Sequence, residues 1–216
     1  MKKWFKMNYF EFQKVFKETP VISVSDVKMY FSNFDRNALT RWQNKGYLEK
    51  IRNGYYRLAD NKPKNEMALF FMANRIYQPS YISLQSALSH YGFIPEGVFT
   101  ATSITTKRKR EFDTLDKTFS YQQIKRELFF GYKLFDFGRF RFKIASPEKA
   151  ILDFLYCYPQ YNSVEDMAGL RWNIFEIKEK IDFEIFTKYL KIFQSKAMNQ
   201  RVKCFLKYIE KYDVIN

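Results

Sequence analysis

The stretch DRNALTRWQNKGYLEKIRNGYYRL, residues 35–58, carries the clearest structural pattern in this chain of 216 residues. Asp35 can cap a helix that runs to about Lys45, and Gly46 suits the left-handed position that follows a helix end. Two strand-like runs then flank Asn53-Gly54, a dipeptide that favours a tight hairpin turn. The stretch therefore predicts a helix followed by a β-hairpin.

Two shorter helical patterns precede this stretch. Residues 8–18 place apolar side chains near helical spacing. A second helix begins at Ser23 or Ser25, both of which are good capping residues, and reaches about Ser32. The order of helix, helix, turn, helix and hairpin predicts a winged helix-turn-helix over residues 1–60.

The third helix has two contrasting faces. One face is apolar and would anchor the helix in the small domain: Ala38, Leu39 and Trp42. The opposite face carries side chains of the types that contact base edges, flanked by cations that suit phosphates. The residues predicted to contact DNA from this helix are Arg36, Asn37, Thr40, Arg41, Asn44 and Lys45. An ordinary solvated helix face is the alternative interpretation.

Two further basic segments are candidate contacts to nucleic acid. Arg52 and Asn53 form the predicted hairpin tip, which could reach a minor groove or the backbone, although a plain surface turn would also use Asn-Gly. A run of four cations follows later in the chain, and a second nucleic-acid contact and a solvated loop explain it about equally well. The run consists of Lys107, Arg108, Lys109 and Arg110.

The polar, proline-containing segment 60–65 predicts a linker to a second region, residues 66–216. This region mixes helical and strand-like patterns, so the expected fold class is α+β: a winged helix-turn-helix followed by a larger mixed α/β domain with a helical C-terminus. The expected elements are helices over 66–77 and 83–91, strands between 98 and 144, a helix that begins at Ser146, and helices over 163–216.

The composition restricts the class of protein. Hydrophobic residues make up 46% of the chain, which is enough for a core and argues against disorder. The net charge of +14 makes nucleic acid the first candidate partner and an anionic membrane surface the second. No segment approaches the ~20 apolar residues of a membrane span, and the basic start, residues 1–6, lacks the apolar stretch of a signal peptide. We therefore expect a cytoplasmic protein.

The residues that could carry catalysis or bind metal lack supporting context. Cys157 and Cys204 are the only cysteines, and His90 is the only histidine. Neither a disulfide framework nor a zinc cluster of the usual composition follows from this set. We expect no enzyme, no metal and no cofactor.

Two alternatives to a plain DNA-binding regulator stay open at this point. One is a nucleic-acid-processing enzyme targeted by the winged helix, in which Asp113, Glu148 and Lys149 would form a nuclease-like set. However, Glu148 already fits the start of a helix. The other is a regulator whose second domain senses a ligand.

Several segments, taken in order, resemble AbiEi-type antitoxins of type IV toxin–antitoxin, or abortive-infection, systems. The resemblance covers most of residues 20–158. The matching segments are 36–42, 45–48, 51–56, 81–88 (Tyr-Ile-Ser-Leu-Gln-Ser-Ala-Leu), Gly92 with Ile94-Pro95-Glu96, 105–108, and 146–150 (Ser-Pro-Glu-Lys-Ala).

The resemblance implies a function in phage defence. It implies a transcriptional autorepressor that binds double-stranded DNA at inverted repeats in its own promoter. It further implies an antitoxin that counters a nucleotidyltransferase-like toxin, directly or indirectly, with residues 66–216 carrying that activity. It implies no membrane partner.

Overall fold

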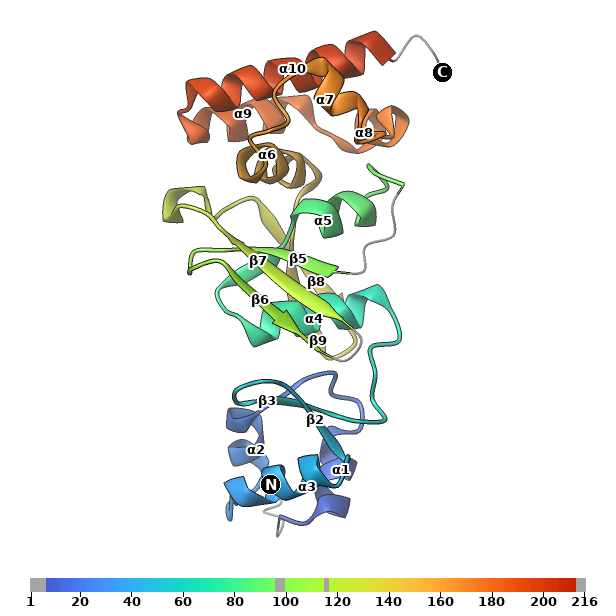
Figure 1. The fold of residues 1–216 in the computed structure, drawn as a ribbon, viewed down its shortest axis with the longest axis vertical. Coiled ribbons are helices and arrows are strands. Elements are labelled where there is room, and N and C mark those ends of the chain that lie inside the picture. Colours follow the sequence, from blue (N-terminus) through green and yellow to red (C-terminus); the bar gives the residue numbers. More distant parts are fainter. Residues whose placement is uncertain (1–6, 96–99, 115–116, 213–216) are drawn as a thin grey trace.

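The computed structural model describes residues 7–95, 100–114 and 117–212, and shows an α+β protein (Figure 1). A small N-terminal unit lies at one end, a mixed sheet with its helices lies in the middle, and the C-terminal helices form the other end. The expected fold class is confirmed. Parts of the sequence interpretation fall on residues that the structure does not describe, namely residues 1–6 and Glu96.

The N-terminal unit is a winged helix-turn-helix with the predicted order of helices and hairpin. Its three-stranded antiparallel sheet has the order β1-β3-β2. The two-residue strand β1 was not predicted, because so short a run has no periodicity of its own. The elements are α1 (Tyr9–Phe16), β1 (Ile22–Ser23), α2 (Val24–Tyr30), α3 (Arg36–Asn44), β2 (Leu48–Arg52) and β3 (Tyr55–Leu58).

The predicted helix caps and the glycine after the third helix of this unit are confirmed. The Ser23 hydroxyl accepts from the Asp26 amide at 3.1 Å, and the Asp26 carboxylate accepts from the Ser23 amide at 2.8 Å, which makes a reciprocal capping box. Asp35 caps α3 by accepting from the Asn37 amide at 2.8 Å. Gly46 follows α3 with φ +72°, a conformation that glycine adopts without strain.

The second region is built on a six-stranded mixed sheet of order β6-β7-β5-β4-β9-β8. Helix α4 packs below this sheet, toward the winged helix, and α5 and α6 pack above it (Figure 1). The bounds are α4 (Glu66–Ile76), β4 (Ser80–Ile82), α5 (Leu84–His90), β5 (Thr100–Thr105), β6 (Arg110–Asp113), β7 (Thr118–Gln123), the 3₁₀ turn η1 (Arg126–Leu128), β8 (Tyr132–Phe137), β9 (Phe140–Ala145) and α6 (Pro147–Cys157).

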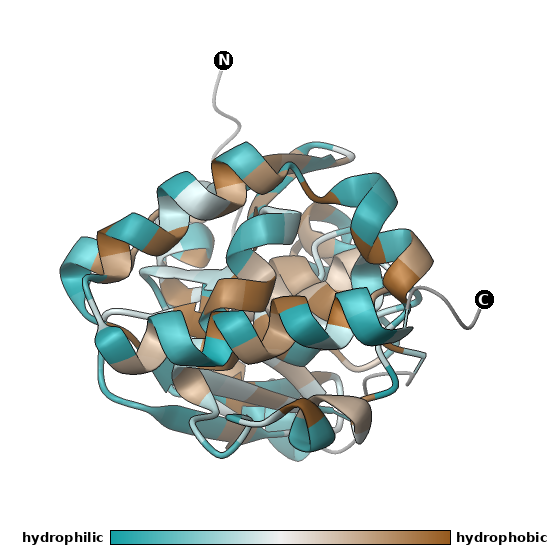
Figure 2. Ribbon diagram, turned by 90° about the horizontal axis from the view of Figure 1, so that it is seen from above, coloured by the Kyte–Doolittle hydropathy of each residue, from teal (hydrophilic) through white to brown (hydrophobic). Residues whose placement is uncertain are grey.

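The C-terminal helices form an outer layer over α6. They are α7 (Val164–Ala168), α8 (Ile174–Lys180), α9 (Phe183–Phe193) and α10 (Lys196–Tyr212). Hydrophobic and hydrophilic residues alternate along these helices at turn spacing in Figure 2. Phe186 and Phe193 of α9 are buried, as are Val202 and Phe205 of α10, so each of these two helices turns an apolar face to the core.

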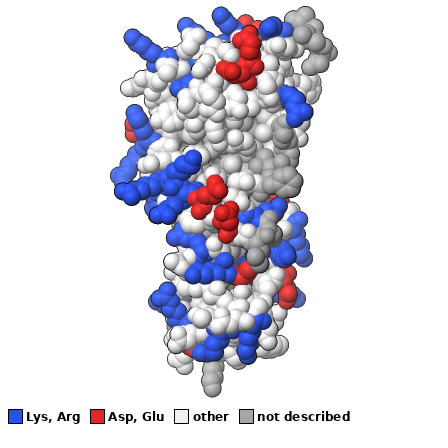
Figure 3. Space-filling view, in the orientation of Figure 1, with Lys and Arg blue, Asp and Glu red and all other residues white. Residues whose placement is uncertain are grey.

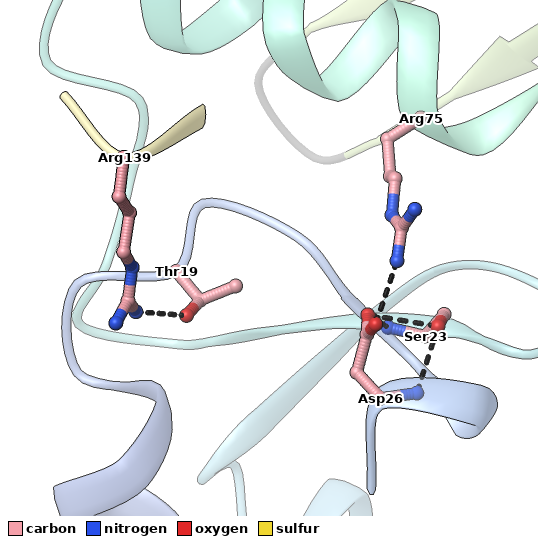
Figure 4. Close-up of polar contacts among 5 residues, drawn as sticks. All are labelled: Thr19, Ser23, Asp26, Arg75 and Arg139. Carbon is pink, nitrogen blue, oxygen red and sulfur yellow. Dashed lines mark hydrogen bonds and ion pairs between the residues drawn. The ribbon is translucent and has the colours of Figure 1, made fainter. Parts of the chain in front are cut away.

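The winged helix and the second region meet in a packed junction. The linker, residues 60–65, is largely exposed, as its composition predicts. However, Val21 and Ile51 of the winged helix are 1% and 5% exposed and belong to the same apolar cluster as the core of the second region. Polar contacts add to this packing in Figure 4: Arg75 pairs with Asp26 at 2.6 Å, and Arg139 donates to the Thr19 hydroxyl at 3.0 Å.

Independent folding of the predicted domains stays a prediction. The contacts at the junction determine how much stability the isolated second region should lose. We expect residues 66–216 to fold alone, because the fragment keeps the whole six-stranded sheet and its covering helices. Its melting temperature should fall below that of the full chain, since removal of Val21 and Ile51 uncovers apolar surface. Circular dichroism of the purified fragment measures both. A fragment without a cooperative melt would show that the two regions form one folding unit.

Candidate nucleic-acid interface

Helix α3 presents the predicted polar face to solvent. Its anchoring residues Ala38, Leu39 and Trp42 are 3%, 0% and 8% exposed. The residues expected to contact DNA from this helix are all exposed: Arg36, Asn37, Thr40, Arg41, Asn44 and Lys45. Figure 1 shows α3 at the end of the molecule, on the side of the winged helix away from the second region. The face is therefore open to a large partner.

Arg41 lies within this face, in the last turn of α3, and its ion pair is exposed. Its Nη2 lies 2.8 Å from Oδ2 of Asp35, and the two side chains are 61% and 45% exposed. The hydrogen bond from Arg41 holds the pKa of the Asp35 carboxyl below its usual value. Exposed ion pairs of this kind contribute little to stability. The guanidinium can therefore leave Asp35, or use its remaining N–H groups, to contact another acceptor.

The structure changes the interpretation of Arg52 at the hairpin tip. Its Nη1 donates to the Ile76 carbonyl at 2.5 Å, and its guanidinium lies 5.2 Å, 5.7 Å and 5.0 Å from the ring centres of Tyr55, Tyr77 and Phe112. The hairpin tip points into the junction, so Arg52 binds the second region, and we leave it out of the proposed DNA contacts. Asn53 is exposed in the turn.

The basic run forms an exposed turn between β5 and β6, close to the same junction. All of its side chains are exposed: Lys107, Arg108, Lys109 and Arg110. The Tyr77 hydroxyl donates to the Arg108 carbonyl at 3.0 Å, and Lys107 Nζ lies 5.6 Å from the Tyr77 ring centre. In Figure 3 a cluster of Lys and Arg side chains projects at mid-height on the left, where Figure 1 places this turn. Tyr77 thus contacts both this turn and Arg52 of the winged helix.

The carboxylates and lysine of the nuclease-like hypothesis have separate structural partners. Asp113 lies on the edge strand β6 and accepts from the Thr118 hydroxyl at 2.7 Å. Glu148 accepts from the Asp182 amide at the start of α9, at 3.1 Å. Lys149 is fully buried. Each of these side chains therefore has a structural contact or environment of its own, and their action as one catalytic set stays a hypothesis that the structure does not test. Over the described ranges there is no group of three His, Cys, Asp or Glu residues that could hold a metal ion.

Lys149 belongs to a buried polar cluster that the sequence interpretation missed. It forms an ion pair with Asp153 one turn later on α6, and both side chains are 0% exposed. The Asp153 carboxylate also accepts from the hydroxyls of Tyr81 at 2.9 Å and Ser83 at 2.8 Å. Gly131 leaves room for the lysine, since a Cβ atom there would lie 3.1 Å from Lys149 Cγ. The i, i+4 spacing of Lys149 and Asp153 was the available signal, but such pairs are usually exposed.

Comparisons with known proteins identify no family for this chain. No family model matches the chain, and no curated protein matches it. Among the described helices, none is both long enough and apolar enough to cross a membrane.

Proposed function

We propose that the protein is a sequence-specific DNA-binding repressor, with α3 as the recognition helix in the major groove. The observation that carries this proposal is the outward polar face of α3, opposite a buried anchoring face and remote from the second region. In a helix-turn-helix the second helix of the pair enters the major groove, where side chains read base edges.

The side chains on this face fit separate roles. Arg41 suits the paired acceptors of a guanine, and Asn37 suits an adenine. Arg36 and Lys45 at the helix ends suit phosphates. The basic turn 107–110 lies at the junction and not beside α3, so a contact between this turn and DNA phosphates would be separate from that of the recognition helix. A protein of net charge +14 gains sequence-independent affinity for DNA from such contacts.

The more specific biological assignment rests on the resemblance to AbiEi-type antitoxins. On that basis we propose a cytoplasmic autorepressor that binds inverted repeats in its own promoter and serves as the antitoxin of a type IV system, without catalytic activity or a cofactor. The paired repeats would require two copies of the winged helix on the DNA.

Replacement of Arg41 by alanine tests the proposed recognition helix. We expect binding to the DNA upstream of the protein's own gene to weaken by about 1–3 kcal/mol, or roughly 5- to 150-fold, if Arg41 contacts a guanine in the bidentate manner. The measurement is a fluorescence-anisotropy titration at one fixed salt concentration. Lys203→Ala is the matched control, because Lys203 is exposed on α10 at the opposite end of the molecule. Equal affinity of Arg41→Ala and the control would refute this role of Arg41.

The antitoxin proposal has its own test in the full-length chain. If residues 66–216 counter the toxin, the Arg41→Ala variant should fail to repress a promoter reporter and still rescue growth when a cognate toxin is induced. Arg41 is exposed on α3, so the variant keeps its fold. Loss of rescue together with loss of repression would show that toxin neutralisation depends on the winged helix.

A further inference from the structure

The second region contains a pocket that the proposed DNA contacts do not use. The pocket has a volume of about 540 Å³ and lies between the sheet and the helices α5 and α6. This volume falls in the ~300–1,000 Å³ range of small-molecule sites. One wall consists of polar side chains on the strands, and the other consists of aromatic side chains on α6 and the segments that follow it.

The aromatic wall is suited to a flat ring. Tyr158, Tyr161 and Trp172 all line the pocket and pack around Phe154, with ring centres 4.9 Å, 5.2 Å and 5.7 Å from it. Trp172 is 5% exposed, and its indole Nε1 has no hydrogen-bond partner in the part of the chain that the structure describes. A buried donor without a partner is unusual and would be satisfied by an acceptor on a bound molecule.

The polar wall offers a carboxylate and a hydroxyl side by side. Glu111 of β6 and Ser120 of β7 are paired across the antiparallel ladder, and both line the pocket. Cross-strand partners point to the same face of a sheet, so their polar groups meet one ligand. A carboxylate is an acceptor only, and it therefore requires donors on that ligand, whereas a hydroxyl can donate to an acceptor beside them.

A cation lies close in the chain to the pocket residue Glu111, although it does not line the pocket itself. Lys109 precedes Glu111 by two residues, and alternate residues of an extended chain share a face. Burial raises the pKa of the Cys157 thiol, at the end of α6, to about 12, while the positive charge of Lys109 acts in the opposite direction. Lys109 therefore lies near the helix end that forms the pocket wall and can attract an anionic group.

We propose that this pocket binds a guanine nucleotide. Guanine is flat, and its N1–H and 2-amino groups are adjacent donors that match the Glu111 carboxylate, with O6 next to them as an acceptor for Ser120. Adenine offers one donor beside an acceptor at the corresponding edge, so the carboxylate disfavours it. The base stacks on the tyrosine rings of the wall. The phosphate extends out of the pocket toward Lys109, which does not itself line it.

Calorimetric titration of the full-length protein tests this site with guanosine 5′-monophosphate, guanosine and adenosine as probes. We expect guanosine to bind about tenfold or more tightly than adenosine, and Glu111→Gln to abolish that preference. The monophosphate should bind more tightly than guanosine, and Lys109→Gln should remove that advantage. Glu165→Gln is the matched control, because Glu165 is exposed on α7 and does not line the pocket.

Tryptophan fluorescence locates the bound probe. Trp42 and Trp172 are the tryptophans in the described part of the chain, and of these two Trp172 lines the pocket, so Trp172→Phe should remove any quenching caused by the monophosphate. Several results would overturn the proposal: no binding of the monophosphate at millimolar concentration, unchanged base preference in Glu111→Gln, equal affinity for guanosine and its monophosphate, or quenching that persists without Trp172.

Discussion

Replacement of Asp153 by alanine should lower the free energy of unfolding by about 3–5 kcal/mol, because it leaves the Lys149 ammonium buried without a counter-ion. The Lys149 Nζ would keep only the Tyr81 hydroxyl, 3.0 Å away, as a polar contact. The rings of Phe130 and Phe193, 4.9 Å and 5.3 Å from Nζ, cannot replace a carboxylate. Urea titration followed by circular dichroism measures the change.

Two further variants show whether the loss of stability in Asp153→Ala comes from the unpaired charge of Lys149. Asp136→Ala removes a carboxylate whose partner, Arg141, is 68% exposed, and it should change stability little. The double variant Lys149→Met with Asp153→Leu removes both charges and should be clearly more stable than Asp153→Ala alone, since apolar side chains often replace buried ion pairs without loss. Equal stability of Asp153→Ala and Asp136→Ala would contradict the described cluster.

Replacement of Trp42 by alanine should destabilise the winged helix by about 3–5 kcal/mol, the usual cost of truncating a buried tryptophan. Trp42 is 8% exposed, and its ring centre lies 5.0 Å from that of Phe12 and 5.5 Å from that of Tyr9. The variant therefore opens a cavity at the contact between α1 and α3. Thermal melting of the full-length variant gives the loss of stability.

A comparison with Asn44→Ala separates the two faces of α3. Asn44 is exposed, so its replacement should leave the melting temperature nearly unchanged and weaken DNA binding. Trp42→Ala should lower the melting temperature first, and its DNA binding should fail only because the domain has loosened. A Trp42→Ala protein with full thermal stability and no DNA binding would mean that the assignment of the faces is reversed.

The winged helix was predictable because its signals are local. Capping residues and Gly46 mark the ends of α3. The 3.6-residue repeat placed Leu39 on the buried face of this helix and Arg41 on the exposed face. The same local signals could not show that Arg52 turns toward Tyr77 and Phe112, since these residues come from distant parts of the chain. A basic residue at a hairpin tip looks the same in sequence whether it meets DNA or another part of its own protein.

In the second region, too, the sequence predicted a local feature and missed a tertiary contact. The start of α6 was predicted from Ser146 and Pro147, and the Ser146 hydroxyl caps the helix as expected. The burial of Lys149 was not, because a single charged residue in a helix usually points to solvent. Its burial depends on the packing of α6 against the sheet, which brings Tyr81 of β4 to the ammonium that Asp153 pairs with from the same helix.

Selection of duplexes from a randomised DNA pool tests sequence-specific recognition by α3. The full-length protein is incubated with the pool at one fixed salt concentration, and bound duplexes are sequenced over successive rounds. We expect the wild-type protein to enrich one motif, and Arg41→Ala to enrich the same motif with one base position relaxed. A pool that stays random, or an identical motif from both proteins, would contradict this expectation.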